Sequence, residues 1–248
     1  CVIGNAATIN TGATDDLDAL ATLCEREHIW FHVDGAIGAL LALAPAHRHL
    51  VHGMERADSV TLDLHKWLHI PFEAACVLVR DRRAHREAFA LTPEYLEKTE
   101  RGLASGALWF SEYGLQLSRG FRALKVWLSI KEHGLDRFGR LIDRNIAQAH
   151  ELAALVQAEP DLELLAPVAT NIVCFRYNPG GLSDEQLNAL NEELLIRLHE
   201  SGIAAPSYTT LDGRYCLRAA IVNYRTTSAD LPVLVGAVRE IGTSLPRP

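Results

Sequence analysis

Short apolar runs alternate with helical segments along the whole chain, and this alternation restricts the possible folds more than any other feature. The strand-like runs of the first third cover residues 1–9, 29–33, 59–64 and 74–80. Between the first two runs, Leu17, Leu20 and Leu23 recur at helical spacing, after acidic residues suited to a helix start. Strands that alternate with helices predict α/β packing around a largely parallel sheet.

The second half of the chain predicts a smaller α+β unit. Residues 162–165, 172–176 and 215–222 have the composition of strands. Ser183 and Gln186 form a capping-box pattern at the start of a leucine-rich helix, and a closing helix is expected from about Ser228. We therefore expect part of a large α/β domain over residues 1–130 and a small α+β domain over residues 131–248.

The segment between these units has a different pattern. Residues 81–110 mix charged residues with glycine and serine, and such a long connection in a compact protein is usually functional or mobile. Residues 117–128 carry apolar side chains at helical spacing, which predicts an amphipathic helix. A further helix is expected over about residues 135–157.

Charge and composition argue against two classes of partner. The net charge of −7 argues against nucleic acid, whose recognition needs a basic stripe. No apolar run approaches the roughly 20 residues of a membrane span, so we expect no membrane partner. Most of the five scattered cysteines lie in apolar segments and are expected to be buried and reduced, which favours the cytoplasm.

Three residues with reactive or polar side chains stand at the carboxyl ends of predicted strands. They are Asp34, His65 and Lys66, and α/β sheets gather their functional residues at such ends. Lysine is scarce in this chain, and Lys66 differs from the other three lysines because it lies between an apolar strand and Trp67. A partly buried lysine in this place suits Schiff-base formation, which by itself leaves an aldolase-type enzyme open.

Asp34 moves the hypothesis towards pyridoxal 5'-phosphate (PLP). This cofactor accepts electrons only while its ring nitrogen stays protonated, which requires a nearby carboxylate. An aspartate that ends one strand and a lysine that ends the next can approach one ligand from opposite sides. The small residues Gly35 and Ala36 leave room for a flat ring close to the backbone.

Several motifs follow one another in order along nearly the whole chain. They are His32-Val33-Asp34-Gly35-Ala36, Ala57-Asp58-Ser59, Asp63-Leu64-His65-Lys66-Trp67-Leu68 and the segments 117–125, 171–176 and 217–223. Together they resemble the group II PLP-dependent decarboxylases, and most closely the aromatic-L-amino-acid decarboxylases. The resemblance implies the carboxyl-terminal half of a fold-type-I PLP enzyme, with a partial large α/β domain and a smaller α+β domain.

The resemblance also implies roles for individual residues. Lys66 would hold the cofactor covalently, and Asp34 would pair with its ring nitrogen. Ala36 would lie against the ring, and His65 would be a polar neighbour of the bond to the lysine. Asp63 stands where relatives have Asn or Asp near the phosphate, although an ionised Asp63 cannot donate a hydrogen bond to it.

Two loop residues complete the implied site. Tyr95, within Pro93-Glu94-Tyr95-Leu96, stands where the family has a loop tyrosine that closes over the substrate and helps to protonate the carbon left by carbon dioxide. Thr8 is expected to contact the cofactor from a strand-end loop. Relatives commonly have two consecutive threonines there, whereas Ile9 follows Thr8 in this chain, so the second polar contact is lost.

The implied reaction is α-decarboxylation of an L-amino acid, with an aromatic substrate favoured. An aldehyde synthase, a carbon–carbon lyase and an inactive half-subunit that serves assembly remain alternatives. Tyr95 favours plain decarboxylation, while Asp34 and Lys66 argue against an inactive chain.

The resemblance further implies a homodimer. The chain lacks an initiator methionine, and its first residues have the composition of a strand. We therefore expect that this sequence starts within a longer polypeptide. In the family an amino-terminal half precedes this point and carries the stacking histidine and much of the phosphate cup, so we expect this chain to need that half.

A group of histidines invites a metal hypothesis. His47, His49 and His52 lie close together, but no cysteine or carboxylate joins them at ligand spacing. A solvated loop is the simpler interpretation, and we predict no metal site.

Overall fold

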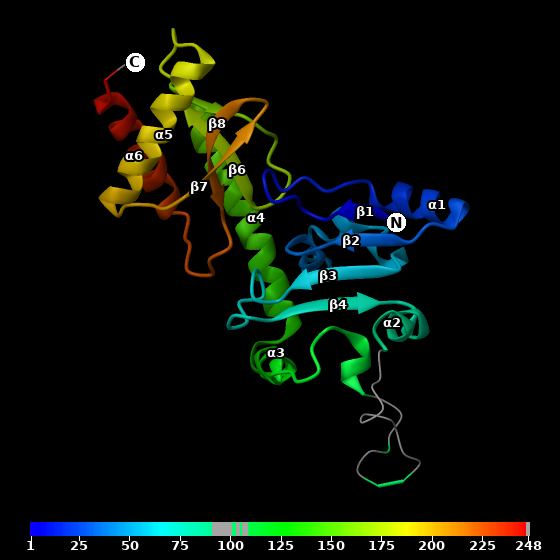
Figure 1. Cartoon of the computed structure of the whole chain (residues 1–248). Coiled ribbons are helices and arrows are strands. Elements are labelled where there is room, and N and C mark those ends of the chain that lie inside the picture. Colours follow the sequence, from blue (N-terminus) through cyan, green and yellow to red (C-terminus); the bar gives the residue numbers. More distant parts are fainter. Residues whose placement is uncertain (91–100, 103–104, 106–108, 247–248) are drawn as a thin grey trace.

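Two four-stranded sheets are joined by one long helix in the part of the chain that the structure describes (Figure 1). The structure is a computed structural model that describes residues 1–90, 101–102, 105 and 109–246. The strands are β1 (Val2–Asn5), β2 (Phe31–Asp34), β3 (Ser59–Asp63), β4 (Ala75–Val79), β5 (Leu162–Leu164), β6 (Ile172–Tyr177), β7 (Ser207–Leu211) and β8 (Arg214–Ala220). The α-helices are α1 (Leu17–Glu27), α2 (Arg82–Phe89), α3 (Arg122–His133), α4 (Leu135–Ala158), α5 (Asp184–Ser201) and α6 (Asp230–Ser244).

The first sheet has the strand order β1-β2-β3-β4. Its first three strands are parallel, as the alternation of strands and helices predicts, but β4 runs antiparallel to β3. The expectation of a largely parallel sheet is therefore confirmed, with β4 as its one antiparallel strand. The link between β3 and β4 contains no helix, and an antiparallel neighbour needs no crossover connection.

Helix α1 covers part of the first sheet and begins where the acidic residues predict. The Asp16 carboxylate caps it by accepting a hydrogen bond from the Ala19 amide at 3.0 Å. Leu17 and Cys24 of α1 are buried in one core together with Phe31 of β2. Because β1 and β2 are parallel, their carboxyl ends lie at one edge of the sheet.

The second sheet is antiparallel, with the order β5-β6-β8-β7. Strand β6 is buried on both faces: Val173 and Phe175 contribute to the core shared with the helices, whereas Cys174 belongs to a small cluster with Cys216. The sequence did not predict β7. Its residues Ser207–Leu211 are polar at several positions, so their composition resembles a loop.

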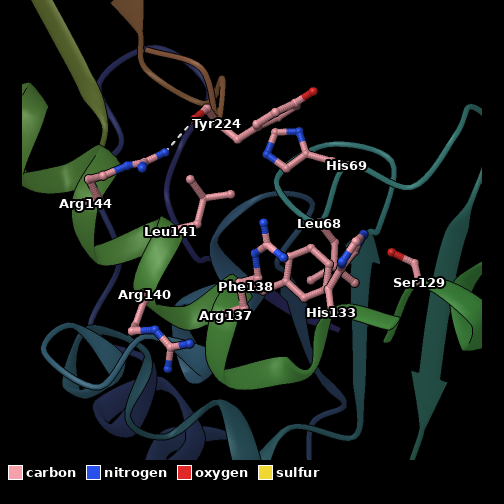
Figure 2. Close-up of a pocket in the computed structure, with 10 residues that line it drawn as sticks. All are labelled: Leu68, His69, Ser129, His133, Arg137, Phe138, Arg140, Leu141, Arg144 and Tyr224. Atoms are coloured by element: carbon pink, nitrogen blue, oxygen red, sulfur yellow. Dashed lines mark hydrogen bonds between the residues drawn. The ribbon is translucent and has the colours of Figure 1, made fainter. Parts of the chain in front are cut away.

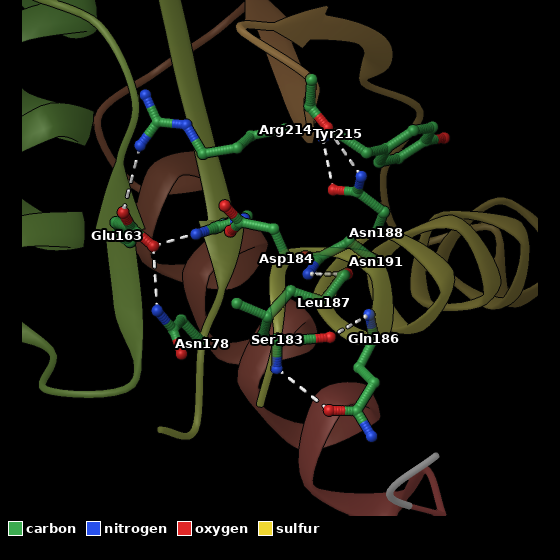
Figure 3. Close-up of polar contacts among 12 residues, drawn as sticks. Glu163, Asn178, Ser183, Asp184, Gln186, Leu187, Asn188, Asn191, Arg214 and Tyr215 are labelled. Carbon is green, nitrogen blue, oxygen red and sulfur yellow. Dashed lines mark hydrogen bonds and ion pairs between the residues drawn. The ribbon is translucent and has the colours of Figure 1, made fainter. Parts of the chain in front are cut away.

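A polar network fixes the start of α5 to the second sheet (Figure 3). The predicted capping box of Ser183 and Gln186 is present. Arg176 of β6 is almost completely buried and pairs with Glu163 at 2.8 Å and with Asp184 at 2.9 Å. Asn178 donates a further hydrogen bond to Glu163 at 2.9 Å. Because the guanidinium of Arg176 has two acceptors, its burial is compensated.

Helix α4 belongs to both units. Ile142 and Ile146 lie in the core of the first sheet, whereas Leu152 and Val156 lie in the core of the second. The expected domain boundary between residues 130 and 131 falls inside α3, and this division of the chain stays a prediction.

Two local predictions in the central segment are wrong. Helix α3 begins at Arg122, so Leu117 lies before the helix and not in its first turn. The expected connection over residues 81–110 contains α2, whose N-cap Asp81 accepts hydrogen bonds from the amides of its first turn. Within the described residues, no helix has both the length and the apolar character needed to cross a membrane.

Candidate functional site

Lys66 and Asp34 lie at the same edge of the first sheet. Asp34 is the last residue of β2, and Lys66 stands in the turn directly after β3, which is parallel to β2. Asp34 is paired in register with Thr61 of β3, so the ends of these two strands are adjacent. The structure therefore brings together the two residues that the sequence singled out.

The amine of Lys66 is paired with a carboxylate. Its Nζ lies 2.7 Å from Oδ2 of Asp63, the last residue of β3. The Lys66 side chain is 42% exposed, which makes it more open than the partly buried lysine that the sequence predicted. In this geometry Asp63 is an acceptor for Lys66, and its expected contact with a phosphate stays a prediction.

Backbone hydrogen bonds fix the direction of the Asp34 carboxylate. Its Oδ1 accepts a hydrogen bond from the Ala36 amide at 3.1 Å, and the Ala36 carbonyl accepts one from the Asp63 amide at 3.1 Å. Gly35 is buried between them, and a Cβ there would lie 2.5 Å from the Cβ of Ala39. Only glycine fits this close approach, so Asp34, Ala36 and Asp63 form one connected backbone unit.

His65 precedes Lys66, and one of its ring nitrogens accepts a backbone hydrogen bond. Its Nδ1 accepts a hydrogen bond from the Ala74 amide at 3.2 Å, so the proton of the neutral ring is placed on Nε2. The edge of Phe72 contacts the ring, with centroids 4.8 Å apart. Nε2 is thus left as a potential donor near the lysine.

The loop after β1, which carries Thr8, is held by the second sheet. Three hydrogen bonds reach its carbonyl groups: from Arg218 to Ile9 (2.6 Å), from Cys174 to Asn10 (3.2 Å) and from Thr170 to Gly12 (3.2 Å). Thr8 itself is half-buried, and its hydroxyl lies 3.3 Å from that of Thr11. The small unit therefore sets the position of the Thr8 loop.

A chain of buried amides connects the turn of Lys66 to α4. The indole of Trp67 donates to Oδ1 of Asn145 at 3.0 Å, and the Asn145 amide donates to Gln148 at 3.2 Å. Gln148 then donates to the carbonyl of Thr226 at 2.8 Å. Sequence reasoning missed this chain, although two amide residues three apart among the apolar positions of one helix could have indicated it.

The remaining candidates are placed as follows. Tyr95 lies outside the described residues, so its role stays a prediction. His47 is more than a solvated loop histidine, because its Nδ1 lies 2.7 Å from Oδ1 of Asp143. Among the described residues, no group of three histidine, cysteine, aspartate or glutamate side chains is arranged to hold a metal ion.

The residues at this edge fit the amine-binding and ring-nitrogen-binding ends of PLP. An accessible amine and a backbone-oriented carboxylate stand at neighbouring strand ends, with Gly35 and Ala36 between them. Lys66 would hold the cofactor, and Asp34 would contact the ring nitrogen.

Comparisons with known proteins agree with this geometry. The chain matches the sequence profile of the pyridoxal-dependent decarboxylase conserved domain over residues 1–178. It is 40% identical over 232 residues to an aromatic-L-amino-acid decarboxylase of Bacillus atrophaeus, a match that covers 93% of this chain and 48% of that protein. It is 32% identical over 217 residues to a phenylacetaldehyde synthase of Arabidopsis thaliana, with coverages of 88% and 44%.

Solved structures give the same result. Oryza sativa TDC, solved with PLP and tryptamine, superposes with a TM-score of 0.89 and 26% sequence identity, covering 98% of this chain and 50% of that one. The chain thus spans about half the length of the relatives it matches.

Proposed function

The chain belongs to the pyridoxal-dependent decarboxylase family, as its motifs predict, and from this premise we propose that it serves the α-decarboxylation of an L-amino acid. The products would be an amine and carbon dioxide. The observation that carries the proposal is the placement of Lys66 and Asp34 at adjacent carboxyl strand ends. Aromatic substrates are favoured, because the similarity to the aromatic-L-amino-acid decarboxylase extends over most of this chain.

Two residues of the chain would act directly on the cofactor. Lys66 would hold the cofactor covalently, and the amine of the substrate would take its place there. Asp34 would keep a proton on the ring nitrogen, and its carboxylate is already oriented by the Ala36 amide. PLP, when bound, accepts the electrons that the departing carboxylate leaves behind.

His65 and Asp63 are the polar neighbours of the reacting amine. The ion pair between Asp63 and Lys66 must open before the amine of Lys66 can react, and Asp63 remains available to orient it. Nε2–H of His65 can donate to an anionic group beside the lysine. Tyr95 is proposed as the proton donor to the carbon that loses its carboxylate.

A second candidate reaction rests on one relative. The chain resembles a phenylacetaldehyde synthase, whose name indicates an aldehyde product, so aldehyde synthesis is the second candidate. Product analysis separates the two: amine and carbon dioxide support decarboxylation, whereas aldehyde, ammonia and peroxide support the synthase. A carbon–carbon lyase would release neither set of products.

We also propose that the working enzyme is a homodimer completed by an amino-terminal half. Three large apolar side chains of α3 support this: Leu124, Trp127 and Leu128 are 44%, 57% and 52% exposed. On β4, the neighbouring residues Val77 and Leu78 point to opposite faces and are both exposed. Apolar surface of this kind is usually covered by protein. A cytoplasmic location is proposed from the free cysteines in the structure.

The test is the absorption spectrum of the purified chain with added PLP. We expect a yellow band that borohydride removes, with the reduced adduct found on the peptide that contains Lys66. Lys66→Ala should abolish the band, whereas Lys131→Ala, a change at an exposed lysine of α3, should not. An undiminished adduct in Lys66→Ala would overturn the proposal.

Absence of a band in the unaltered chain requires a second measurement. The same spectrum is then recorded with a full-length subunit that contains an amino-terminal half. A band on Lys66 in that protein supports the proposal and the need for the missing half. No band in either protein would identify an inactive assembly subunit instead.

A further inference from the structure

A basic cavity lies between α3, α4 and the turn that follows Lys66. Its volume is about 760 Å³. Figure 2 shows the residues that line it, with Arg144 reaching towards Tyr224. None of the lining residues is Lys66, Asp63 or Asp34, so the cavity is separate from the candidate cofactor site.

The lining is strongly positive in a chain that is negative overall. Arg137, Arg140 and Arg144 all line the cavity, whereas no aspartate or glutamate does, although the whole chain carries a net charge of −7. Arg137 and Arg140 form no ion pair with any described residue. The positive charge of this cavity is therefore not neutralised by the part of the chain that the structure describes.

Helix stability does not explain these arginines. They are spaced three and four residues apart, so they share one face of α4 and repel one another. Arg137 also lies in the first turn of the helix, where its dipole disfavours cations. Their placement costs stability, which favours a role in binding.

The opposite wall contains an unsatisfied polar atom. Nε2 of His69 is buried and has no hydrogen-bond partner among the described residues. Burial lowers the pKa of His69, so the ring is neutral at neutral pH. The rings of His69 and Tyr224 are in edge contact at 5.6 Å, and Arg144 donates to the Tyr224 carbonyl at 2.6 Å. This wall is therefore fixed, and it contains a buried imidazole nitrogen without a partner among the described residues.

We propose that this cavity binds a small organic phosphate. Arg137 and Arg140 would hold the phosphate, because guanidinium groups match its oxygen atoms in paired hydrogen bonds. Ser129 and His133 add donors from α3, and Phe138 and Leu141 offer an apolar surface to the organic part.

The dimensions favour a small molecule over a segment of polypeptide. Ligand cavities commonly measure roughly 300–1,000 Å³, and the volume of this cavity lies within that range. An acidic polypeptide would be expected to follow a longer groove.

The experiment is calorimetric titration of the complete chain with phenyl phosphate. This probe has no aldehyde and cannot react with Lys66, so its result is independent of the proposed function. We expect saturable binding at one site, weaker binding of inorganic phosphate and no binding of phenol. The double variant R137Q/R140Q should weaken binding about tenfold or more.

A matched variant controls for net charge. R26Q/R197Q removes the same two charges from exposed ion pairs with Glu27 and Glu193 and should leave the affinity unchanged. R26Q/R197Q should keep the melting temperature, because both arginines are exposed. R137Q/R140Q should keep or raise it, because the change removes the repulsion between these arginines on α4. Two results would overturn the proposal: no saturable binding at about 10 mM ligand, or equal weakening by both variants. Binding of polyglutamate without binding of phenyl phosphate would also overturn it, because the cavity would then be a docking surface for polypeptide.

Discussion

Arg218 of β8 donates a hydrogen bond from Nε to the carbonyl of Ile9 at 2.6 Å, although the two residues are 209 positions apart. Together with Thr170 and Cys174, Arg218 tethers the loop that carries Thr8 to the second unit. The loop's own hydrogen bonds, from the Thr8 amide to Ala13 (2.7 Å) and from the Gly12 amide to Thr8 (2.8 Å), form within this framework. A loop that belongs to the first unit is thus positioned by the second.

Replacing Arg218 by glutamine should loosen this loop. A hydrogen bond to a charged donor contributes about 1.5–3 kcal/mol, so the amides of Thr8 and Gly12 should exchange with deuterium about tenfold faster or more. Arg214→Gln, a change on the same strand, should leave their exchange unaltered. Unchanged exchange in Arg218→Gln would show that the tether does not hold the loop.

Gly12→Ala should destabilise the chain more than Gly213→Ala. Both glycines have positive φ, +75° and +78°, but a Cβ at Gly12 would lie 2.1 Å from Oγ1 of Thr170, whereas nothing lies within 4 Å at Gly213. We expect a loss of about 1 kcal/mol at Gly213 from conformation alone, and about 1–3 kcal/mol more at Gly12 from the clash. Urea unfolding measures both, and adding Thr170→Ala should restore part of the loss at Gly12. Equal losses at the two glycines would contradict this account.

Asn145→Ala should destabilise the turn of Lys66. The substitution leaves the buried indole N–H of Trp67 without its acceptor, which costs about 1–3 kcal/mol. Gln157→Ala, at an exposed position of the same helix, should change the unfolding free energy by less than about 0.5 kcal/mol. Thermal or urea unfolding distinguishes the two variants, and similar small losses in both would exclude a structural role for the buried chain of amides.

Acid should destabilise the second unit through Glu163. Burial raises the pKa of the Glu163 carboxyl, but hydrogen bonds from Arg176 and Asn178 and the charges of Arg176 and Arg214 outweigh it, so the pKa lies below its ordinary value of 4.5. A carboxyl with a depressed pKa in the folded state contributes stability above its unfolded pKa, and this contribution disappears as the pH falls through the folded pKa.

Glu163→Gln should therefore lower stability at neutral pH and flatten the loss of stability between about pH 5 and pH 3. Glu193→Gln, which removes an exposed ion pair with Arg197, should leave the pH profile almost unchanged. Melting temperatures measured across this range test the prediction. A profile of Glu163→Gln that parallels the unaltered chain would rule out Glu163 as the titrating group.

Asp34→Asn should remove decarboxylation while leaving the attachment of the cofactor. The amide keeps the size of the side chain but removes the charge that holds the proton on the ring nitrogen, so turnover by the complete enzyme should fall about a hundredfold or more. Borohydride should still fix the cofactor on Lys66. Normal turnover in Asp34→Asn would remove Asp34 from the proposed mechanism.

The sequence by itself determined the local helices and strands and the sheet edge that carries the candidate site residues. Strand composition and strand ends placed Asp34 and Lys66 correctly, and Ser183 with Gln186 correctly predicted the start of α5. These features depend on interactions between residues close in sequence, so periodicity and capping patterns report them. The family motifs added the cofactor, because a match of several motifs in order is specific where a single lysine is not.

Only the tertiary structure decided the direction of β4 and the way in which the two units are connected. The antiparallel direction of β4, the division of α4 between two cores, and the contact of Arg218 with Ile9 depend on residues far apart in sequence. Such contacts leave no periodic signal in the sequence. An arginine is the same residue in the sequence whether its side chain faces solvent or bonds a distant carbonyl. The same reason hid the arginine cavity, since Arg137, Arg140 and His69 line one cavity only after the turn of Lys66 has packed beside α4.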